Sequence, residues 1–229
     1  MPERDNTGLL IDVDGTLVDT EALHFKTWQQ AFRENSVEFS SADFNRVFGL
    51  DPIPTVMTQL RCSHERASEI AGRKAELFRE KAADVRSFPG AAAFLAEARR
   101  EGLVIALIGS TSRADVENYL LPCIGHRGIV DLVVTGEMVS RGKPEPDTLN
   151  LALETLGVAP GRAVTIGDTV FDVTAGKKAG VTVIGVNSDP ARAKLLRSAG
   201  ADHVVPDLKT ARRFISDWTQ SLSNLAPGF

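Results

Sequence analysis

The chain has 229 residues, which suits one large domain or one domain that carries an insertion. Hydrophobic residues make up 43% of it, and acidic and basic residues are interspersed to a formal net charge of −4, so the basic stripe of a nucleic-acid-binding protein is excluded. No apolar run approaches the roughly 20 residues that span a bilayer, and the polar N-terminal segment does not resemble a signal peptide. We therefore expect a cytoplasmic monomer without nucleic-acid or membrane partners.

A short apolar run near the start leads directly into a pair of acids. Residues 9–11 are typical of a strand that is buried on both faces. Asp12 and Asp14 then lie at or just past its carboxyl end, and Gly15 allows a tight turn. Ligands bind at this edge of open parallel sheets. An Asp-Gly turn with solvated acids is the alternative, and this stretch alone leaves it open.

Residues from about 20 to 86 are predicted to form helix after helix, without a convincing strand. The apolar positions of residues 23–32 can share one helical face. Ser40 and Ser63 have capping character, and Ser63 precedes a long amphipathic run. Between them, the prolines of residues 50–54 predict a break in regular structure.

From residue 88 onward, helical and strand patterns alternate. Strands are predicted at 103–108, 132–134, 163–166, 181–185 and 203–205. Helices are predicted at 91–101, 113–121, 146–156, 169–179, 190–198 and 208–222. Such alternation predicts an α/β protein with a doubly wound parallel sheet. We expect a core formed by residues 1–18 and 88–229, with an all-helical cap domain inserted at 19–87.

Polar residues follow several predicted strands. Ser110 opens a helix, where free backbone N–H groups favour a phosphate. Lys143 lies in a loop between Gly and Pro, while Gly167 and Asp168 end a strand and Asp172 follows. Taken alone, Lys143 is typical of an exposed loop lysine and Asp172 of a helix surface acid. Together with Asp12 and Asp14, however, these groups suit Mg²⁺ and an anionic substrate, and the lack of thiol or imidazole clusters argues against zinc.

Four segments resemble, in order, the four motifs of the haloacid dehalogenase (HAD) superfamily. They are residues 12–16, Ser110, Lys143 and residues 167–172. The resemblance covers nearly the whole core, and it implies that the α/β core is Rossmann-like. The helical insertion after the first motif is similar to that superfamily's first cap type.

The resemblance implies a catalytic role for each motif residue. Asp12 would attack phosphorus and form an aspartyl phosphate. Asp14 would protonate the leaving oxygen and then deprotonate the hydrolytic water. Ser110, the backbone N–H of Thr111 and Lys143 would hold the phosphoryl oxygens.

The resemblance also implies a Mg²⁺ cofactor. Its ligands would be Asp12, the carbonyl oxygen of Asp14 and Asp168. Asp172 would be a further ligand, directly or through water, or would orient Lys143. Two more residues are expected to support the motif loops, Thr16 and Gly167.

Residues 19–28 are similar to the same segment of β-phosphoglucomutase and its phosphatase relatives. His24 and Trp28 match positions there, and His24 is expected near the active site, although a histidine on a polar helix otherwise lies more often at the surface. Lys74 falls near a basic cap residue of that group. His24 and Lys74 are therefore candidate substrate contacts, whereas Thr20 is expected only to cap the helix that follows it.

The expected function is Mg²⁺-dependent hydrolysis of a small phosphorylated metabolite, with a sugar phosphate as one candidate. A metal-free dehalogenase would not gather Asp14 and Asp168 beside its nucleophile, and a non-catalytic protein would not need every motif residue. The open alternative is a phosphomutase similar to β-phosphoglucomutase.

A phosphomutase must also bind a second phosphate under its cap. β-Phosphoglucomutase uses an arginine in the segment corresponding to residues 48–54, which contains none here. Asp51 would repel a phosphate, and Pro52 and Pro54 lack backbone donors. Hydrolysis is therefore expected, although three basic residues keep the alternative open: Arg46, Arg61 and Lys74.

Overall fold

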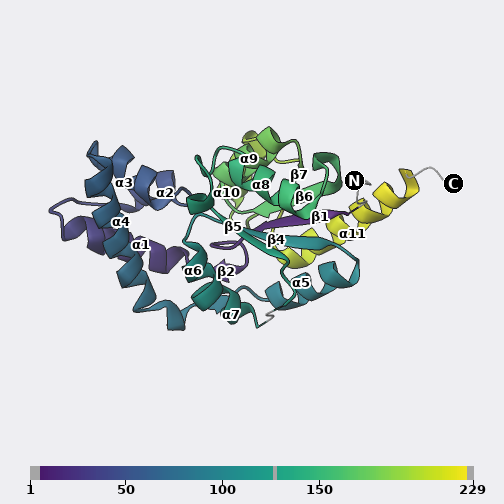
Figure 1. Cartoon of the computed structure of the whole chain (residues 1–229), viewed down its shortest axis with the longest axis horizontal. Helices are drawn as coiled ribbons and strands as arrows, with labels where there is room; N and C mark the ends of the chain where they lie inside the picture. Colours follow the sequence, from purple (N-terminus) through teal and green to yellow (C-terminus); the bar gives the residue numbers. More distant parts are fainter. Residues whose placement is uncertain (1–5, 126–127, 226–229) are drawn as a thin grey trace.

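The computed structural model describes residues 6–125 and 128–225, and its centre is a parallel sheet of six strands. Their order is β5-β4-β1-β6-β7-β8. The bounds are β1 (Gly8–Asp12), β4 (Val104–Gly109), β5 (Leu132–Thr135), β6 (Ala163–Gly167), β7 (Thr182–Val186) and β8 (His203–Val205). β1 lies inside the sheet, where Leu9 pairs with Ile105 of β4 and with Val164 of β6 (Figure 1). The predicted parallel sheet is thereby confirmed.

Helices cover both faces of this sheet, which explains the unbroken apolar run in β1. Leu9 packs on one face with α5 (Ala91–Arg100) and α11 (Leu208–Leu225). Leu10 packs on the other with α8 (Asp147–Leu156) and α9 (Val170–Ala179). Because successive side chains of a strand point to opposite faces, a strand between two helical layers needs apolar residues at every position. The remaining core elements are α6 (Arg113–Asp115), the π-turn η2 (Val116–Leu120), α7 (Leu121–Ile124), η3 (Gly136–Met138), η4 (Pro160–Arg162) and α10 (Pro190–Ser198).

The segment between β1 and α5 folds into a helical lobe beside the sheet (Figure 1). The lobe comprises α1 (Glu21–Arg33), α2 (Ser41–Val47), α3 (Pro52–Leu60), α4 (His64–Arg79) and η1 (Ala82–Asp84). It has an apolar cluster of its own, in which Trp28 and Phe32 of α1 pack with Ile70 and Leu77 of α4. The structure therefore has the helices that the sequence predicts for this segment.

Two short strands join the lobe to the core. β2 (Val18–Asp19) pairs antiparallel with β3 (Arg86–Ser87). The chain thus enters and leaves the lobe through one hydrogen-bonded ribbon. The sequence patterns did not predict these strands, because two residues are too few to establish a period.

The prediction that residues 50–54 break regular structure is wrong from Pro52 onward. Pro52 occupies the first position of α3, and the helix continues through Pro54 to Leu60. The first turn of a helix has N–H groups without intrahelical partners, so proline costs little there and its fixed φ favours the helix. The prolines start this helix instead of preventing it.

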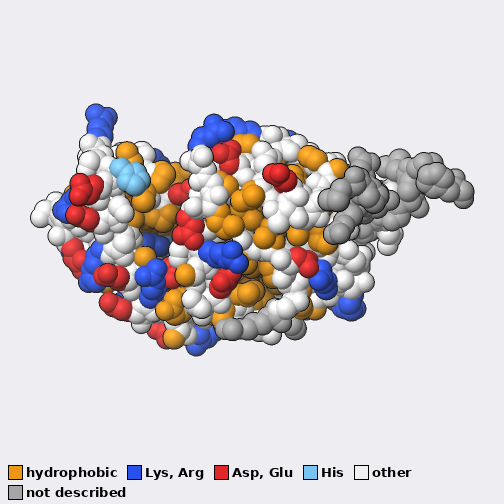
Figure 2. All heavy atoms as spheres, in the orientation of Figure 1, with side chains coloured by type: hydrophobic (Ala, Val, Ile, Leu, Met, Phe, Trp, Pro, Cys, Tyr) orange, Lys and Arg blue, Asp and Glu red, His pale blue; other side chains and the backbone are white. Residues whose placement is uncertain are grey.

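Acidic and basic side chains are interspersed over the face shown in Figure 2. Among the described residues, the helices lack a stretch with the length and apolarity that crossing a bilayer requires.

Candidate active site

The predicted core residues meet at the carboxyl edge of the sheet. Asp12 ends β1, Gly167 ends β6 just before Asp168, and Ser110 follows β4. Parallel strands end at the same edge, so side chains far apart in the sequence lie together there. Lys143 reaches this edge from the loop after β5, where its Nζ lies 2.5 Å from Asp12 Oδ1.

Three buried carboxylates form a cluster that could hold a metal ion. Asp12, Asp168 and Asp172 each offer an oxygen, and these atoms lie within 4.8 Å of one another. Asp12 Oδ2 is buried and has no hydrogen-bond partner among the described residues. Thr16 Oγ1 donates to Asp168 Oδ1 at 3.0 Å, which links the β1 loop to the β6 loop. Carboxylate oxygens are the protein ligands that Mg²⁺ prefers, so the donor set fits this ion.

The electrostatics of this cluster indicate a deficit of positive charge. Burial raises the pKa of Asp12 to about 8, with Lys143 opposing the rise and Asp172 adding to it. Burial, together with the charges of Asp12 and Asp172, raises the pKa of Asp168 well above its usual range. Although burial opposes it, Asp12 and Asp172 raise the pKa of Lys143, which therefore stays protonated. Among the described residues, the Lys143 ammonium is the one cation that forms ion pairs within the cluster of Asp12, Asp168 and Asp172, and a divalent cation would offset the remaining repulsion between those carboxylates.

Asp172 has bonds on both of its oxygens. Oδ1 lies 2.6 Å from Lys143 Nζ. Oδ2 accepts hydrogen bonds from the Thr169 N–H at 3.0 Å and from the Thr169 hydroxyl at 2.5 Å, as part of the capping box of α9. The helix start therefore fixes Asp172, and Asp172 in turn orients Lys143 toward Asp12.

The Asp14 carboxylate makes its hydrogen bonds outside the cluster of Asp12, Asp168 and Asp172. Its Oδ1 accepts a hydrogen bond from Thr20 Oγ1 at 2.7 Å and lies 2.9 Å from His24 Nε2. Its Oδ2 accepts from Thr111 Oγ1 at 2.8 Å. Burial alone would raise the pKa of Asp14, but the interaction with His24 and the hydrogen bonds from Thr20 and Thr111 lower it overall. The lobe and the core thus hold this carboxylate between them.

The expectation that Thr20 only caps α1 is wrong. Thr20 has a helical backbone conformation at the N-cap and accepts no capping hydrogen bond there from the described backbone. Its hydroxyl donates to Asp14 instead, because the tight turn at Gly15 folds the chain back. A hydroxyl six residues after an acid is too general a signal to identify this contact in a sequence.

His24 and Lys74, the predicted lobe residues, are both buried at the site. Lys74 Nζ lies 2.7 Å from His24 Nδ1, and the His24 ring stacks on Phe78 with centroids 4.7 Å apart. An ammonium only donates, so Nδ1 accepts and Nε2 carries the proton that faces Asp14. Burial lowers the pKa of Lys74 to about 8, and burial with the Lys74 charge lowers the pKa of His24. Lys74 thus lies behind His24 rather than beside Asp14.

The lobe closes directly over the predicted phosphate-binding residues. The Ser110 hydroxyl donates to the Gly49 carbonyl at 2.8 Å. Gly49 has a φ of +98°, and an added Cβ would press on Thr169 at 3.0 Å, so only glycine suits this position. Nothing in the local sequence pattern predicts this contact. The pocket at this contact is here called the catalytic cavity, and its lining includes Asp12, Asp14, His24, Lys74, Ser110 and Thr111.

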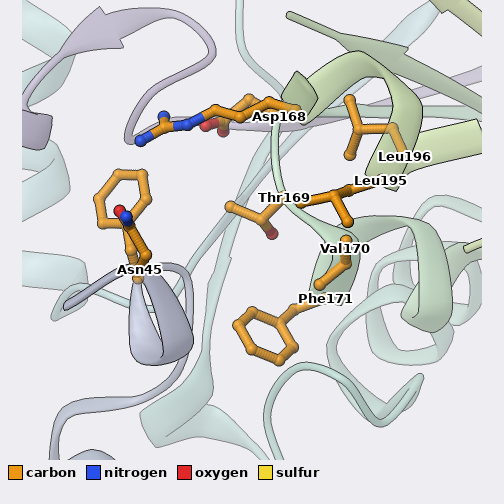
Figure 3. A pocket seen from close by; sticks show the side chains of 9 residues that line it. Asn45, Asp168, Thr169, Val170, Phe171, Leu195 and Leu196 are labelled. Carbon is orange, nitrogen blue, oxygen red and sulfur yellow. The ribbon is translucent and has the colours of Figure 1, made fainter. Parts of the chain in front are cut away.

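The catalytic cavity measures only about 30 Å³, enough for water but not for a phosphorylated metabolite. A second pocket of about 160 Å³ lies on the Asp168 side of the same junction. Figure 3 shows Asn45 of the lobe on one side of this pocket and Thr169 and Phe171 of the core on the other. The junction between lobe and core is therefore incompletely filled around a very small closed site.

Known proteins resemble this chain in sequence and in fold. Residues 9–186 match the family described as haloacid dehalogenase-like hydrolase. Protein CbbY of Cereibacter sphaeroides is 34% identical, and the match covers 77% of this chain and 82% of that protein. Fructose-1-phosphate phosphatase YqaB of Escherichia coli is 28% identical over 78% of this chain and 95% of that protein. The structure of a CbbY mutant from Rhodobacter sphaeroides in complex with xylulose-(1,5)bisphosphate matches with a TM-score of 0.77 and 29% identity, over 89% of this chain and 95% of that one.

Proposed function

Because the chain belongs to the haloacid dehalogenase-like hydrolase family, we propose that it is a Mg²⁺-dependent phosphatase. Its substrate is a small phosphorylated metabolite, and a sugar phosphate is one candidate. The observation that carries this proposal is the environment of Asp12: Lys143 holds one oxygen, and the other is buried without a partner among the described residues. Such a carboxylate is oriented by one oxygen and free to react through the other. Relatives that are named as phosphatases support the same assignment.

In the proposed reaction, Asp12 Oδ2 attacks phosphorus and the bond between phosphorus and the leaving oxygen breaks. Because the pKa of Asp14 is lowered in the free site, this carboxylate takes up a proton as the dianionic substrate binds beside it. It gives that proton to the leaving oxygen and then takes one from the water that hydrolyses the aspartyl phosphate. The His24 N–H that faces Asp14 is placed to stabilise the carboxylate between these two transfers.

Three groups would hold the phosphoryl oxygens. They are the Ser110 hydroxyl, the Thr111 backbone N–H and the Lys143 ammonium. Asp12, Asp168 and the Asp14 carbonyl would hold Mg²⁺, which would offset the repulsion between an anionic nucleophile and an anionic substrate. A panel of phosphorylated metabolites, assayed for released phosphate with and without Mg²⁺, tests the assignment. Failure to release phosphate from any of them would contradict it.

We propose that residues 19–87 act as a cap that opens to admit substrate and closes for reaction. The cavity in this structure is too small for a substrate, and the lobe is connected covalently to the core only through the two strands of the β2–β3 ribbon. Such a double connection suits a hinge, and closure would exclude bulk water. Small-angle scattering should therefore give a larger radius of gyration for the free protein than for the protein with substrate and a phosphate-mimicking metal fluoride. Identical profiles in both states would count against the hinge.

The alternative, a phosphomutase, predicts a different fate for the aspartyl phosphate. We expect transfer to water, because Asp51 and two prolines occupy the lobe segment where a second phosphate would need basic or N–H donors. Phosphorus NMR of the enzyme with Mg²⁺, β-glucose 1-phosphate and priming bisphosphate separates the two functions. Hydrolysis yields inorganic phosphate. Accumulation of glucose 6-phosphate with little inorganic phosphate would instead assign a mutase.

A further inference from the structure

Asp51 is the N-cap residue of α3, yet its side chain makes no capping hydrogen bond with the described backbone of that helix. The local sequence explains why. A capping carboxylate accepts from the N–H groups at the second or third helical position. The third position here is Pro54, which has no N–H, and Pro52 at the first position has none either. Among the first three helical positions, the two prolines therefore leave only the Ile53 N–H to retain the carboxylate on its own helix.

The Asp51 carboxylate instead crosses from the lobe to the core. There it lies against Gly136, just after β5, and Gly142, just before Lys143. An added Cβ on either glycine would overlap the carboxylate, although neither glycine has a positive φ that would itself disfavour a side chain. Both positions thus leave space that the Asp51 carboxylate fills. We call Gly136 and Gly142 the glycine cradle.

The carboxylate in this cradle keeps unused hydrogen-bonding capacity. Asp51 Oδ1 is buried and has no hydrogen-bond partner among the described groups. Burial raises the pKa of Asp51, while the Lys143 charge and the polar hydrogens of Ser110 and Gly142 oppose that rise. A desolvated acceptor of this kind is stabilised by an incoming donor and destabilised by an incoming anion.

Asp51 also lines a groove that adjoins the catalytic cavity. The groove has a volume of about 820 Å³ and is lined by residues of the lobe segment 50–54 and of the core segment 136–144. This groove and the catalytic cavity share four lining residues: Leu50, Pro52, Ser110 and Thr111. The pocket on the Asp168 side shares only Phe48 with that cavity. A leaving group too large for the cavity therefore has its broadest continuation into the groove, past Asp51.

The permanently charged cations that line this groove already contact carboxylates of the protein. Among the described residues that line it, these are Arg141 and Lys143. Arg141 donates to the Asp147 carboxylate at 3.2 and 3.4 Å. Lys143 is held by Asp12 and Asp172. Neither cation is free to neutralise both Asp51 and an anionic substituent of the substrate.

We propose that Asp51 determines specificity: it selects phosphate esters whose leaving group presents a hydroxyl or amine donor and rejects those that carry a second anionic group. The glycine cradle fixes the carboxylate in this position when the lobe closes. The inference rests on the proposed phosphatase function, which it extends to a class of substrate.

Two phosphate esters that differ at one group provide the test. Glycerol 3-phosphate carries a terminal hydroxymethyl group where 3-phosphoglycerate carries a carboxylate. We expect the wild type to prefer glycerol 3-phosphate in kcat/KM by about tenfold or more, because like charges brought together in a closed site repel strongly. Asp51→Asn, which removes the charge and keeps the shape, should reduce that ratio at least about tenfold. Glu38→Gln, an equal change at an exposed lobe residue, should leave the ratio unchanged.

A second variant tests the cradle without altering Asp51. Gly136→Ala should displace the Asp51 carboxylate and lower the preference for glycerol 3-phosphate over 3-phosphoglycerate. Adding Gly136→Ala to Asp51→Ala should not change that preference further, because the carboxylate that the new methyl group would overlap is already absent. An equal ratio in the wild type and in Asp51→Asn would overturn the proposal, as would a wild type that prefers 3-phosphoglycerate.

Binding measurements separate this inference from the proposed function. Titration calorimetry with both esters is done on Asp12→Asn and on Asp12→Asn/Asp51→Asn, where turnover does not interfere. Tighter binding of 3-phosphoglycerate after loss of the Asp51 charge supports the specificity role whatever the reaction. An unchanged affinity contradicts it, whereas absent phosphate release by the wild type contradicts only the phosphatase assignment.

Discussion

Asp12→Asn is expected to lower kcat for phosphate release by about 10⁴-fold or more without unfolding the protein. Asparagine has nearly the shape of aspartate, but its amide is a poor nucleophile, and loss of a nucleophile typically costs several orders of magnitude. Lys143 and Asp172 keep their own ion pair in the variant, so the loop that carries Lys143 should remain in place.

Without bound metal, the same variant should be at least as stable as the wild type near pH 8. Burial raises the pKa of Asp12 to about 8 in the folded protein, above its usual value of about 4 in an unfolded chain. The folded state therefore binds more protons in that interval, and stability without a bound metal falls as pH rises from about 4 to about 8. Asparagine cannot ionise, so the variant should melt at the same temperature as the wild type or higher near pH 8 in EDTA.

Phosphate release and thermal unfolding, measured side by side, check both expectations. Asp217→Asn is a matched control, because it makes the same chemical change at an exposed position of α11. Mass spectrometry must show that the introduced asparagine has not deamidated back to aspartate. Normal phosphate release by the intact variant would reassign the nucleophile.

Removal of divalent metal with EDTA is expected to abolish activity, and added Mg²⁺ should restore it. The physical reason is the cluster of Asp12, Asp168 and Asp172, which has one ammonium for three buried carboxylates. Mg²⁺ should also raise the melting temperature, since a ligand present at about 100 times its Kd stabilises the folded state by about 2.7 kcal/mol.

Asp168→Asn should lose most of this Mg²⁺-dependent stabilisation, because it removes a carboxylate that the cluster contributes. Asp217→Asn again serves as the control and should keep it. Full activity in EDTA, with buffers verified as metal-free, would rule out the metal requirement. A melting temperature that does not respond to Mg²⁺ in the wild type would place the metal elsewhere.

The parallel sheet could be predicted from the sequence because burial on both faces leaves a local signature. β1 is apolar at consecutive positions, and glycines mark the ends of several helices and strands. The order of the motif residues then followed from the rule that parallel strands end at one edge. Local patterns failed where an element was too short, as in β2 and β3, and where Pro52 started a helix that it was expected to prevent.

The sequence by itself determined which chemical groups this protein brings to its site. Asp12, Ser110, Lys143 and Asp168 follow predicted strands or loops, and their side chains suit phosphate and a hard cation whatever the details of packing. Burial, hydrogen-bond partners and the space around each group were decided only by the tertiary structure. Those properties depend on residues that are distant in the sequence.

Contacts between the lobe and the core show this most clearly. The Gly49 carbonyl meets the Ser110 hydroxyl, and the Asp51 carboxylate fills the glycine cradle. Each contact joins residues that are more than 60 positions apart, through a lobe whose closure no local pattern encodes. Periodicity and capping rules act over a few neighbouring residues, so they identify the helices of the lobe but not the surface on which it closes. The chemical groups of the site can therefore be predicted from the sequence, whereas the fit between lobe and core depends on the folded structure of both.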